Sequence, residues 1–185
     1  MSKLSDLTSA AARILGNMNL SQKAVLAINA ASAATVKTTG ALVFLVDGIQ
    51  YTKAALSAQV LSALAAADFV ASTSQAALNY LQPSGLTGFY VQPASTTVYY
   101  VLCVNNAGTV KVVQGTYDGQ QLLAGLSAPG KSWVPDIPET WTPIGLIKIV
   151  TNSSTTFTPA TTALDAAGLT VTFTDLAMLP SANAP

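Results

Sequence analysis

Short runs of β-prone residues, each ended by turn residues, place the strongest limit on how this chain can fold. Ala41 to Val46 and Ile49 to Lys53 flank the dipeptide Asp47-Gly48. A second pair of runs, residues 98–104 and 109–113, flanks a turn of the Asn/Gly type. Turn residues of these types between β-prone runs are typical of hairpins. The sequence therefore predicts two antiparallel hairpins.

Further strands are expected at residues 89–91, 143–150 and 169–174. In the last of these, apolar residues alternate strictly with threonine, which predicts a strand with one buried face. The expected total is six or seven short strands joined by turns. This number fits a small antiparallel β-sandwich or barrel.

The N-terminal residues 1–34 follow a helical spacing instead. Gly16-Asn17 predicts a break, and Ser21 predicts the start of a second helix, Gln22 to Ala34. The fold class expected is mainly β with an N-terminal helical arm (α+β), although a disordered tail is an alternative for this segment. Such an arm is marginal alone, so it should dock either on its own domain or on a neighbouring subunit. The candidate interaction face of the arm, from its three- and four-residue spacing, is Leu4, Leu7, Ile14, Leu15 and Met18.

One helix is expected inside the β-rich domain, residues 35–180. Leu56, Val60, Leu61 and Leu64 return to helical spacing without Gly or Pro, so a helix is predicted near 54–70. The Ser-, Gln-, Pro- and Gly-rich residues 71–88 and the longer segment 115–142 are predicted to be connections, the second an ordered contact loop. Residues 181–185 are predicted to form a loose tail.

The composition points to association with other subunits. The chain has 31 Ala, 22 Thr and 16 Ser among its 185 residues, and only 9% of the residues are charged. Soluble domains usually carry about 25% charged residues, and a net charge near zero promotes association. The only charge asymmetry is a net +3 over residues 1–40, from four basic residues against Asp6, balanced by −3 in the rest.

Several kinds of site are excluded by residue type. The chain has no His, which removes Ser-His-Asp triads, Cys-His pairs and HExxH zinc sites. Its single cysteine, Cys103, lies in an apolar run and is expected to be a buried, inert thiol. We therefore expect no enzyme activity, no cofactor and no metal. The apolar runs are too short to span a membrane, no signal peptide is visible, and no basic region indicates nucleic-acid binding.

Three groups of residues carry weak alternatives. Asp136 and Glu139 could act as paired carboxylates, but two solvated charges on a loop explain them better. Gly125 to Gly130 lacks the spacing of a nucleophile elbow. The aromatic residues could stack on sugars or bases, although a core or an interface explains them equally well. These aromatic residues are Phe89, Tyr90, Tyr99, Tyr100, Trp133 and Trp141.

The β-rich half of the sequence resembles small structural proteins of tailed bacteriophages, over roughly residues 40–179. The resemblance is a pattern of short β motifs. These motifs are Asp47-Gly48 with Tyr51 to Ala54, Tyr99 to Thr116, Pro138, Pro143 to Ile149, and Phe157 to Leu176.

The resemblance implies a virion component, and more narrowly a capsid decoration (cement) protein or head-fibre protein. A decoration protein would be made in the bacterial host cytoplasm, bind the major capsid protein on the outer shell, and often form a homotrimer. Its mechanism would be mechanical, since area buried between capsid subunits resists internal pressure and repeated weak contacts add avidity. The alternatives are a head-fibre, tail or baseplate component and a module that binds host glycans.

Overall fold

The computed structural model of the chain describes residues 17–20, 25–64, 89, 91–117, 137 and 140–176. This part of the chain is mainly β, as predicted, and forms three antiparallel sheets without a helix. The strands are β1 Met18–Asn19, β2 Leu26–Ile28, β3 Thr35–Thr38, β4 Leu42–Val46, β5 Ile49–Lys53, β6 Gln59–Val60, β7 Thr97–Asn105, β8 Val110–Gln114, β9 Trp141–Thr151 and β10 Leu169–Asp175.

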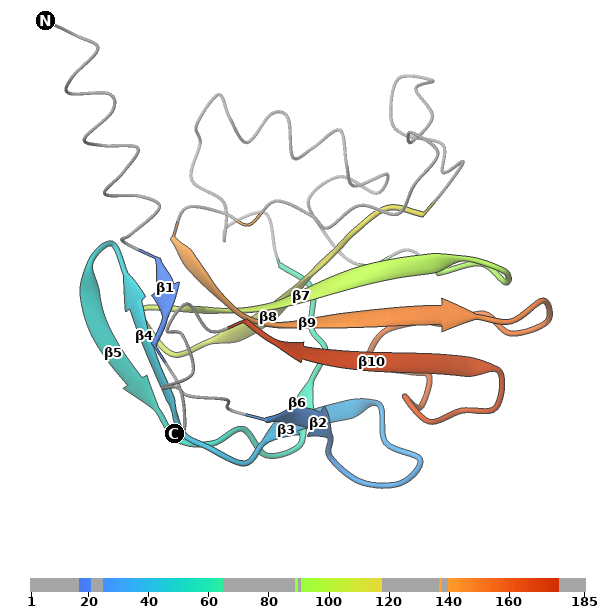
Figure 1. The fold of residues 1–185 in the computed structure, drawn as a ribbon, viewed down its shortest axis with the longest axis horizontal. Coiled ribbons are helices and arrows are strands. Elements are labelled where there is room, and N and C mark those ends of the chain that lie inside the picture. The colour runs from blue at the N-terminus through green and yellow to red at the C-terminus, as the bar shows by residue number, and fades with distance from the viewer. Residues whose placement is uncertain are drawn as a thin grey trace, which may run out of the picture.

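The three sheets surround one core (Figure 1). The large sheet has the order β10-β9-β7-β8 and runs across the middle of the molecule. The small sheet, β2-β3-β6, lies below it in this view, and the hairpin sheet, β1-β4-β5, lies at one end. Each sheet contributes side chains to the main hydrophobic cluster, so the small sheet and the hairpin sheet together cover one face of the large sheet.

The predicted hairpins are confirmed. In the β4–β5 hairpin, Asp47 and Gly48 both have positive φ, 51° and 77°, which is the type I′ geometry that suits the twist of two strands. In the β7–β8 hairpin, the side-chain oxygen of Asn105 accepts hydrogen bonds from the amides of Ala107 (3.1 Å) and Thr109 (2.9 Å). Local turn chemistry therefore fixes both hairpins.

Two of the three further predicted strands are confirmed. The run at 143–150 lies in β9, and the run at 169–174 lies in β10. The strand predicted at 89–91 is wrong where it is described, since Phe89 and Val91 lie outside any strand and Tyr90 lies outside the described residues. The residue that follows, Gln92, forms an isolated antiparallel bridge with Phe157.

The helical arm predicted for residues 1–34 is wrong wherever the structure describes this segment. Met18 lies in β1, opposite Leu45, and residues 26–28 form β2. Val25 and Ser32 have φ values of 51° and 56°, in the left-handed region, which a right-handed helix cannot contain. The other candidate face residues, Leu4, Leu7, Ile14 and Leu15, lie outside the described residues.

The inserted helix near 54–70 is also wrong over its described part, residues 54–64. Ala58 has a φ of 48°, and the next two residues form β6. Leu56, Leu61 and Leu64 are buried from a non-helical chain, so their spacing reflects separate core positions rather than one helix face. Residues 65–70, the connection 71–88 and the tail 181–185 lie outside the described residues, as does most of the connection 115–142.

The segment after β6 joins the small sheet to the large sheet. Ala63 forms a parallel bridge with Val112 of β8, and the amide of Val112 donates to the carbonyl of Ser62 (2.8 Å). At the opposite edge of the large sheet, the amide of Leu26 in β2 donates to the carboxylate of Asp175 (2.9 Å). The small sheet is thus held to both outer strands of the large sheet.

β7 is the most deeply buried strand of the large sheet. Its residues Val98, Tyr100, Leu102 and Val104 face the main cluster. Cys103 faces the other way, into a second cluster with Leu64, Val113 and Trp141. Because both faces of the strand are covered, nearly every residue from Val98 to Val104 is apolar, which is the pattern of a strand buried on both sides.

A glycine in β9 allows β2 to approach the large sheet closely. A Cβ atom at Gly145 would lie 2.5 Å from Cδ2 of Leu26, whose side chain is buried in the main cluster. β9 also has an irregularity here, because Leu102 pairs with Gly145 while Cys103 pairs with Pro143. Such a bulge accommodates the proline, which has no amide to donate to the ladder.

We predict that Gly145→Ala lowers the free energy of unfolding by about 1–3 kcal/mol, because the added methyl group displaces the packed Leu26 side chain. Denaturant unfolding measures this loss. The matched control is the same substitution in a Leu26→Ala background, where the cost should shrink because the colliding side chain is gone. An equal cost in both backgrounds would contradict this explanation.

Candidate interaction surface

The single thiol lies inside the fold. Cys103 is fully buried in β7, and its Sγ donates a weak hydrogen bond to the carbonyl of Lys111 (3.4 Å). This confirms the expected burial. Other sequence candidates for chemistry, namely Asp136, Glu139, Trp133 and residues 125–130, lie outside the described residues.

The carboxylates of Asp165 and Asp175 bind backbone amides. Asp165 accepts from the amide of Ser32 through both oxygens (3.1 and 2.9 Å), and Asp175 accepts from the amide of Leu26. Both bonds attach the ends of β2 and its following turn to the segments around β10. Within the described ranges, no group of three or more His, Cys, Asp or Glu side chains is placed to hold a metal ion.

A fully buried polar network surrounds Tyr100. Its hydroxyl donates to Oε1 of Gln92 (3.1 Å) and accepts from Nε2 of Gln114 (3.1 Å). Nε2 of Gln92 donates in turn to the carbonyls of Thr96 (3.1 Å) and Ile149 (3.0 Å). Because buried polar groups are costly without partners, this satisfied network fixes the 92–96 segment against β7, β8 and β9.

The phenol of Tyr100 is held in its neutral form. Burial raises its pKa far above the ordinary value of about 10, and the hydrogen bond from Gln114 lowers it by a smaller amount. The ring also packs edge-on against Phe157, at a centroid distance of 5.7 Å. Tyr100 is therefore a structural residue rather than a sugar-stacking one.

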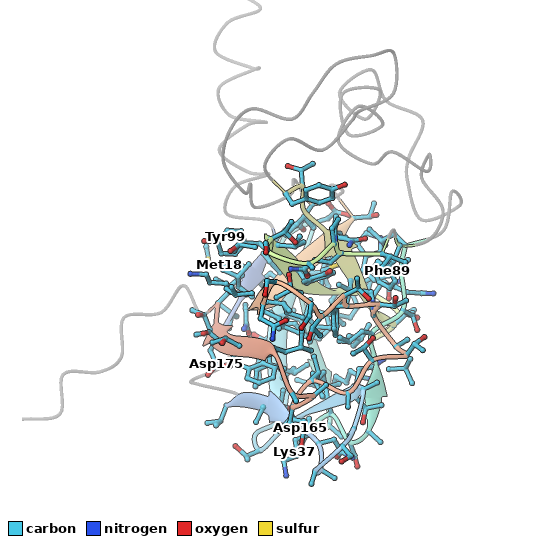
Figure 2. The ribbon with its side chains drawn as sticks, turned by 90° about the vertical axis from the view of Figure 1, so that its right-hand side faces the viewer. Met18, Lys37, Phe89, Tyr99, Asp165 and Asp175 are labelled. Atoms are coloured by element: carbon cyan, nitrogen blue, oxygen red, sulfur yellow. The ribbon has the colours of Figure 1, made fainter. Side chains whose placement is uncertain are left out.

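The neighbouring tyrosine lies on the opposite face of the large sheet. Adjacent residues of a strand point to opposite sides of the sheet, so Tyr99 faces outward. Figure 2 shows it near the surface of the molecule. Tyr99 is opposite Lys148 of β9, which is opposite Thr172 of β10. Trp141, by contrast, is buried at 2% exposure. Of the aromatic residues proposed for stacking, the described ones that are not fully buried are Phe89 and Tyr99.

We define the outer face as the outward-pointing side chains that are not fully buried in β10, in residues 145–151 of β9, which pair with β10, and in residues 97–102 of β7. The alternation of each strand assigns them, because the residues between them face the core. Lys148 is the single charged residue of this set, and the others are threonine, tyrosine or aliphatic. The outer face consists of Thr97, Tyr99, Leu146, Lys148, Val150, Thr170, Thr172 and Thr174.

β10 gives the large sheet an exposed edge. It pairs with β9 from Leu169 to Asp175 without a register shift, and no described strand pairs with its other side. Leu169, Val171 and Phe173 point toward the core but are only partly buried. The strand contains no proline, bulge or lysine, which are the features that commonly protect strand edges from association.

β5 gives the hairpin sheet a second exposed edge. It lies at the end of the order β1-β4-β5, and Ile49 at its start is 59% exposed. Gln50 and Thr52 are also exposed. This strand differs from β10 because it ends in a lysine, Lys53, a residue typical of protected edges.

The sequence predicted a different interaction surface. It placed contacts on an amphipathic helix, but the one described member of that set, Met18, lies in a strand at the edge of the hairpin sheet (Figure 2). The strict alternation of Leu169 to Thr174 was a usable signal for β10. Its position at a sheet edge was not predictable, because edges depend on the order of strands.

Comparison with protein-family models, curated proteins and solved structures found no significant match. Among the described residues, no helix is long and apolar enough to cross a membrane.

We predict that Tyr100→Phe lowers the free energy of unfolding at neutral pH by about 1–3 kcal/mol, because Gln92 and Gln114 each lose a buried partner. The wild type should lose stability as the pH rises above about 10, since the unfolded state then releases the phenolic proton while the folded state retains it. Tyr100→Phe should show a shallower loss. Denaturant unfolding between pH 7 and about 11 measures both effects.

The matched control for this prediction is Tyr99→Phe, on the outer face of the same strand. It should leave the stability at neutral pH close to that of the wild type, because the Tyr99 hydroxyl is not part of the network of Tyr100, Gln92 and Gln114. Equal slopes for the wild type and Tyr100→Phe would contradict the assignment to Tyr100.

Proposed function

We propose that this chain is a non-enzymatic structural component of a tailed-phage virion, namely a capsid decoration protein that binds the outer shell and bridges capsid subunits. The observation that carries the proposal is a β domain with two long exposed strand edges and an outer face with one charge. The motifs that resemble phage structural proteins include β8, β10 and most of β7 and β9, the four strands of the large sheet. The proposed partner is the major capsid protein.

The hydrogen bonds of the described polar side chains favour a protein-binding role over a small-molecule pocket. Tyr100, Gln92 and Gln114 bond one another inside the core. Asp165 and Asp175 bond backbone amides. Because these groups are used within the fold, the surfaces left for a partner are strand edges and a broad sheet face, which suit another protein.

Self-association is part of the proposal. Three copies around a threefold axis would cover strand edges that are otherwise exposed, and several shell contacts per trimer would act together. In the virion the chain would lie on the capsid surface, after synthesis in the host cytoplasm.

Co-sedimentation with shells of the encoding phage tests the proposal. We expect the purified chain to pellet with shells that lack it, at a fixed ratio to the major capsid protein, and to raise the temperature at which those shells open. Antibody labelling of intact virions separates head from tail components. Label spread over the head surface supports a decoration protein, whereas label at a few sites on projections from the head, or on tails or baseplates, contradicts it. Binding on a glycan array without shell binding would favour the glycan-binding alternative.

A pair of N-terminal deletions tests where the shell contact lies. We predict that removal of residues 1–16 leaves the sheets folded, because it retains β1 and β2. It should also abolish co-sedimentation, because it removes Leu4, Leu7, Ile14 and Leu15, four members of the candidate interaction face predicted from the sequence, which we propose as a shell contact beside the strand edges and the outer face. Removal of residues 1–34 should instead unfold the domain, because it removes β1, which pairs with β4, and β2, which pairs with β3. Circular dichroism and co-sedimentation measure the two outcomes, and full shell binding after removal of residues 1–16 would contradict the prediction.

A further inference from the structure

The exposed edge of β10 has the properties of a self-pairing strand. We propose that β10 pairs antiparallel with β10 of a second copy of this chain, about a two-fold axis at Val171, so that two large sheets become one continuous sheet. In this register Val171 lies opposite Val171 of the second copy, and Leu169 lies opposite Phe173. The inference goes beyond the proposed function, because it assigns one strand, one symmetry axis and one register to a contact between two copies and holds whatever the shell partner is.

The backbone of β10 presents most of the groups that this pairing needs. The exception is the amide of Leu169, which donates to the carbonyl of Ala166 (3.1 Å), so Leu169 contributes only its carbonyl to the pairing. The amide of Asn152 donates to the carbonyl of Gly168 (2.9 Å), and the amide of Leu176 donates to the carbonyl of Ile144 (3.3 Å). Even-numbered residues of β10 therefore direct their backbone groups toward β9. Because these groups alternate along an antiparallel strand, the backbone groups of Val171 and Phe173 point to the exposed edge.

The side chains of β10 match their own antiparallel copy. On the core side, Val171 meets itself and Leu169 meets Phe173, so only apolar groups face one another. On the outer side, Thr170 meets Thr172. Aromatic, β-branched and Thr–Thr cross-strand pairs stabilise antiparallel sheets, each by a fraction of a kcal/mol, about 0.2–1.

Two features of this edge are compatible with a second copy beside it. Leu169, Val171 and Phe173 pack against the core but remain partly exposed, and a strand added beside them would cover them further. The paired stretch also excludes Asp175, whose carboxylate binds the amide of Leu26. Each β10 strand thus pairs only through its uncharged part.

A two-fold contact is compatible with the proposed trimer but cannot close it. An isologous interface joins exactly two copies, so β10 would join copies that belong to different trimers. Seven-residue edges bury far less area than the roughly 1,600 Å² of a standard stable interface. The contact is therefore weak for one pair and gains strength when many copies are arrayed.

Disulfide trapping tests this register directly. In the proposed pairing, Thr170 and Thr172 of the two copies form a non-hydrogen-bonded pair, whose short separation permits a disulfide. Thr170→Cys and Thr172→Cys chains, one carrying a mass tag, are mixed in a glutathione redox buffer. We expect a mixed disulfide dimer at several times the yield of either homodimer, and Cys103 is buried, so the wild type should form none.

The controls use the other exposed edge. A mixture of Gln50→Cys and Thr52→Cys, on β5, reports cross-linking by random collision, and melting temperatures of all variants report folding. The substituted threonines are exposed, so these chains should fold like the wild type. A yield of the mixed disulfide dimer no higher than that of the β5 control would overturn the proposal. A Thr172→Cys homodimer as the main product would overturn the register, because it places the two-fold axis at Thr172.

Discussion

All three sheets meet along residues 142–145 of β9, and the arrangement of the domain depends on this stretch. The hydroxyl of Thr142 donates to the carbonyl of Leu45 in β4. The side-chain amide of Asn19 in β1 donates to the carbonyl of Ile144 in β9 (3.5 Å) and to that of Leu176, which follows β10 (2.7 Å). Gly145 leaves room for Leu26 of β2. At this stretch the hairpin sheet is thus attached through hydrogen bonds, whereas the small sheet packs closely against it because Gly145 has no side chain.

Hydrogen bonds of buried polar side chains also hold segments of the chain against the large sheet. Gln92 is fully buried, and its amide reaches the carbonyl of Ile149 in β9 as well as the hydroxyl of Tyr100 in β7. A chain rich in small residues has few large side chains with which to hold its connections in place. Hydrogen bonds of amide and hydroxyl groups hold the connections instead. Because a buried polar group without a partner costs free energy, any other packing of these connections is unfavourable.

Where local chemistry decides the structure, the sequence was sufficient to predict it. Asp47-Gly48 adopts the turn geometry that its residue types favour, and the alternating residues of β10 form a strand. The helices were mispredicted because apolar spacings of three and four residues also arise when separate extended segments enter one core. Ala58 shows the decisive difference: its left-handed backbone ends any helix there, yet alanine has high intrinsic helix propensity. Tertiary contacts, which no local pattern contains, override that propensity.

The interaction surface was harder to predict than the strands, for a related reason. The sequence identifies β10 as a strand with one buried face, but strand order makes it an edge, and order is set by contacts with β9. Scarcity of charge predicts association in general, and this stays a prediction. The contacts that we propose for β10 have the same character, because backbone hydrogen bonds, threonine pairs and apolar side chains carry no net charge. Because salt screens charges but not such contacts, association through β10 should persist at ionic strengths that dissociate charge-driven assemblies.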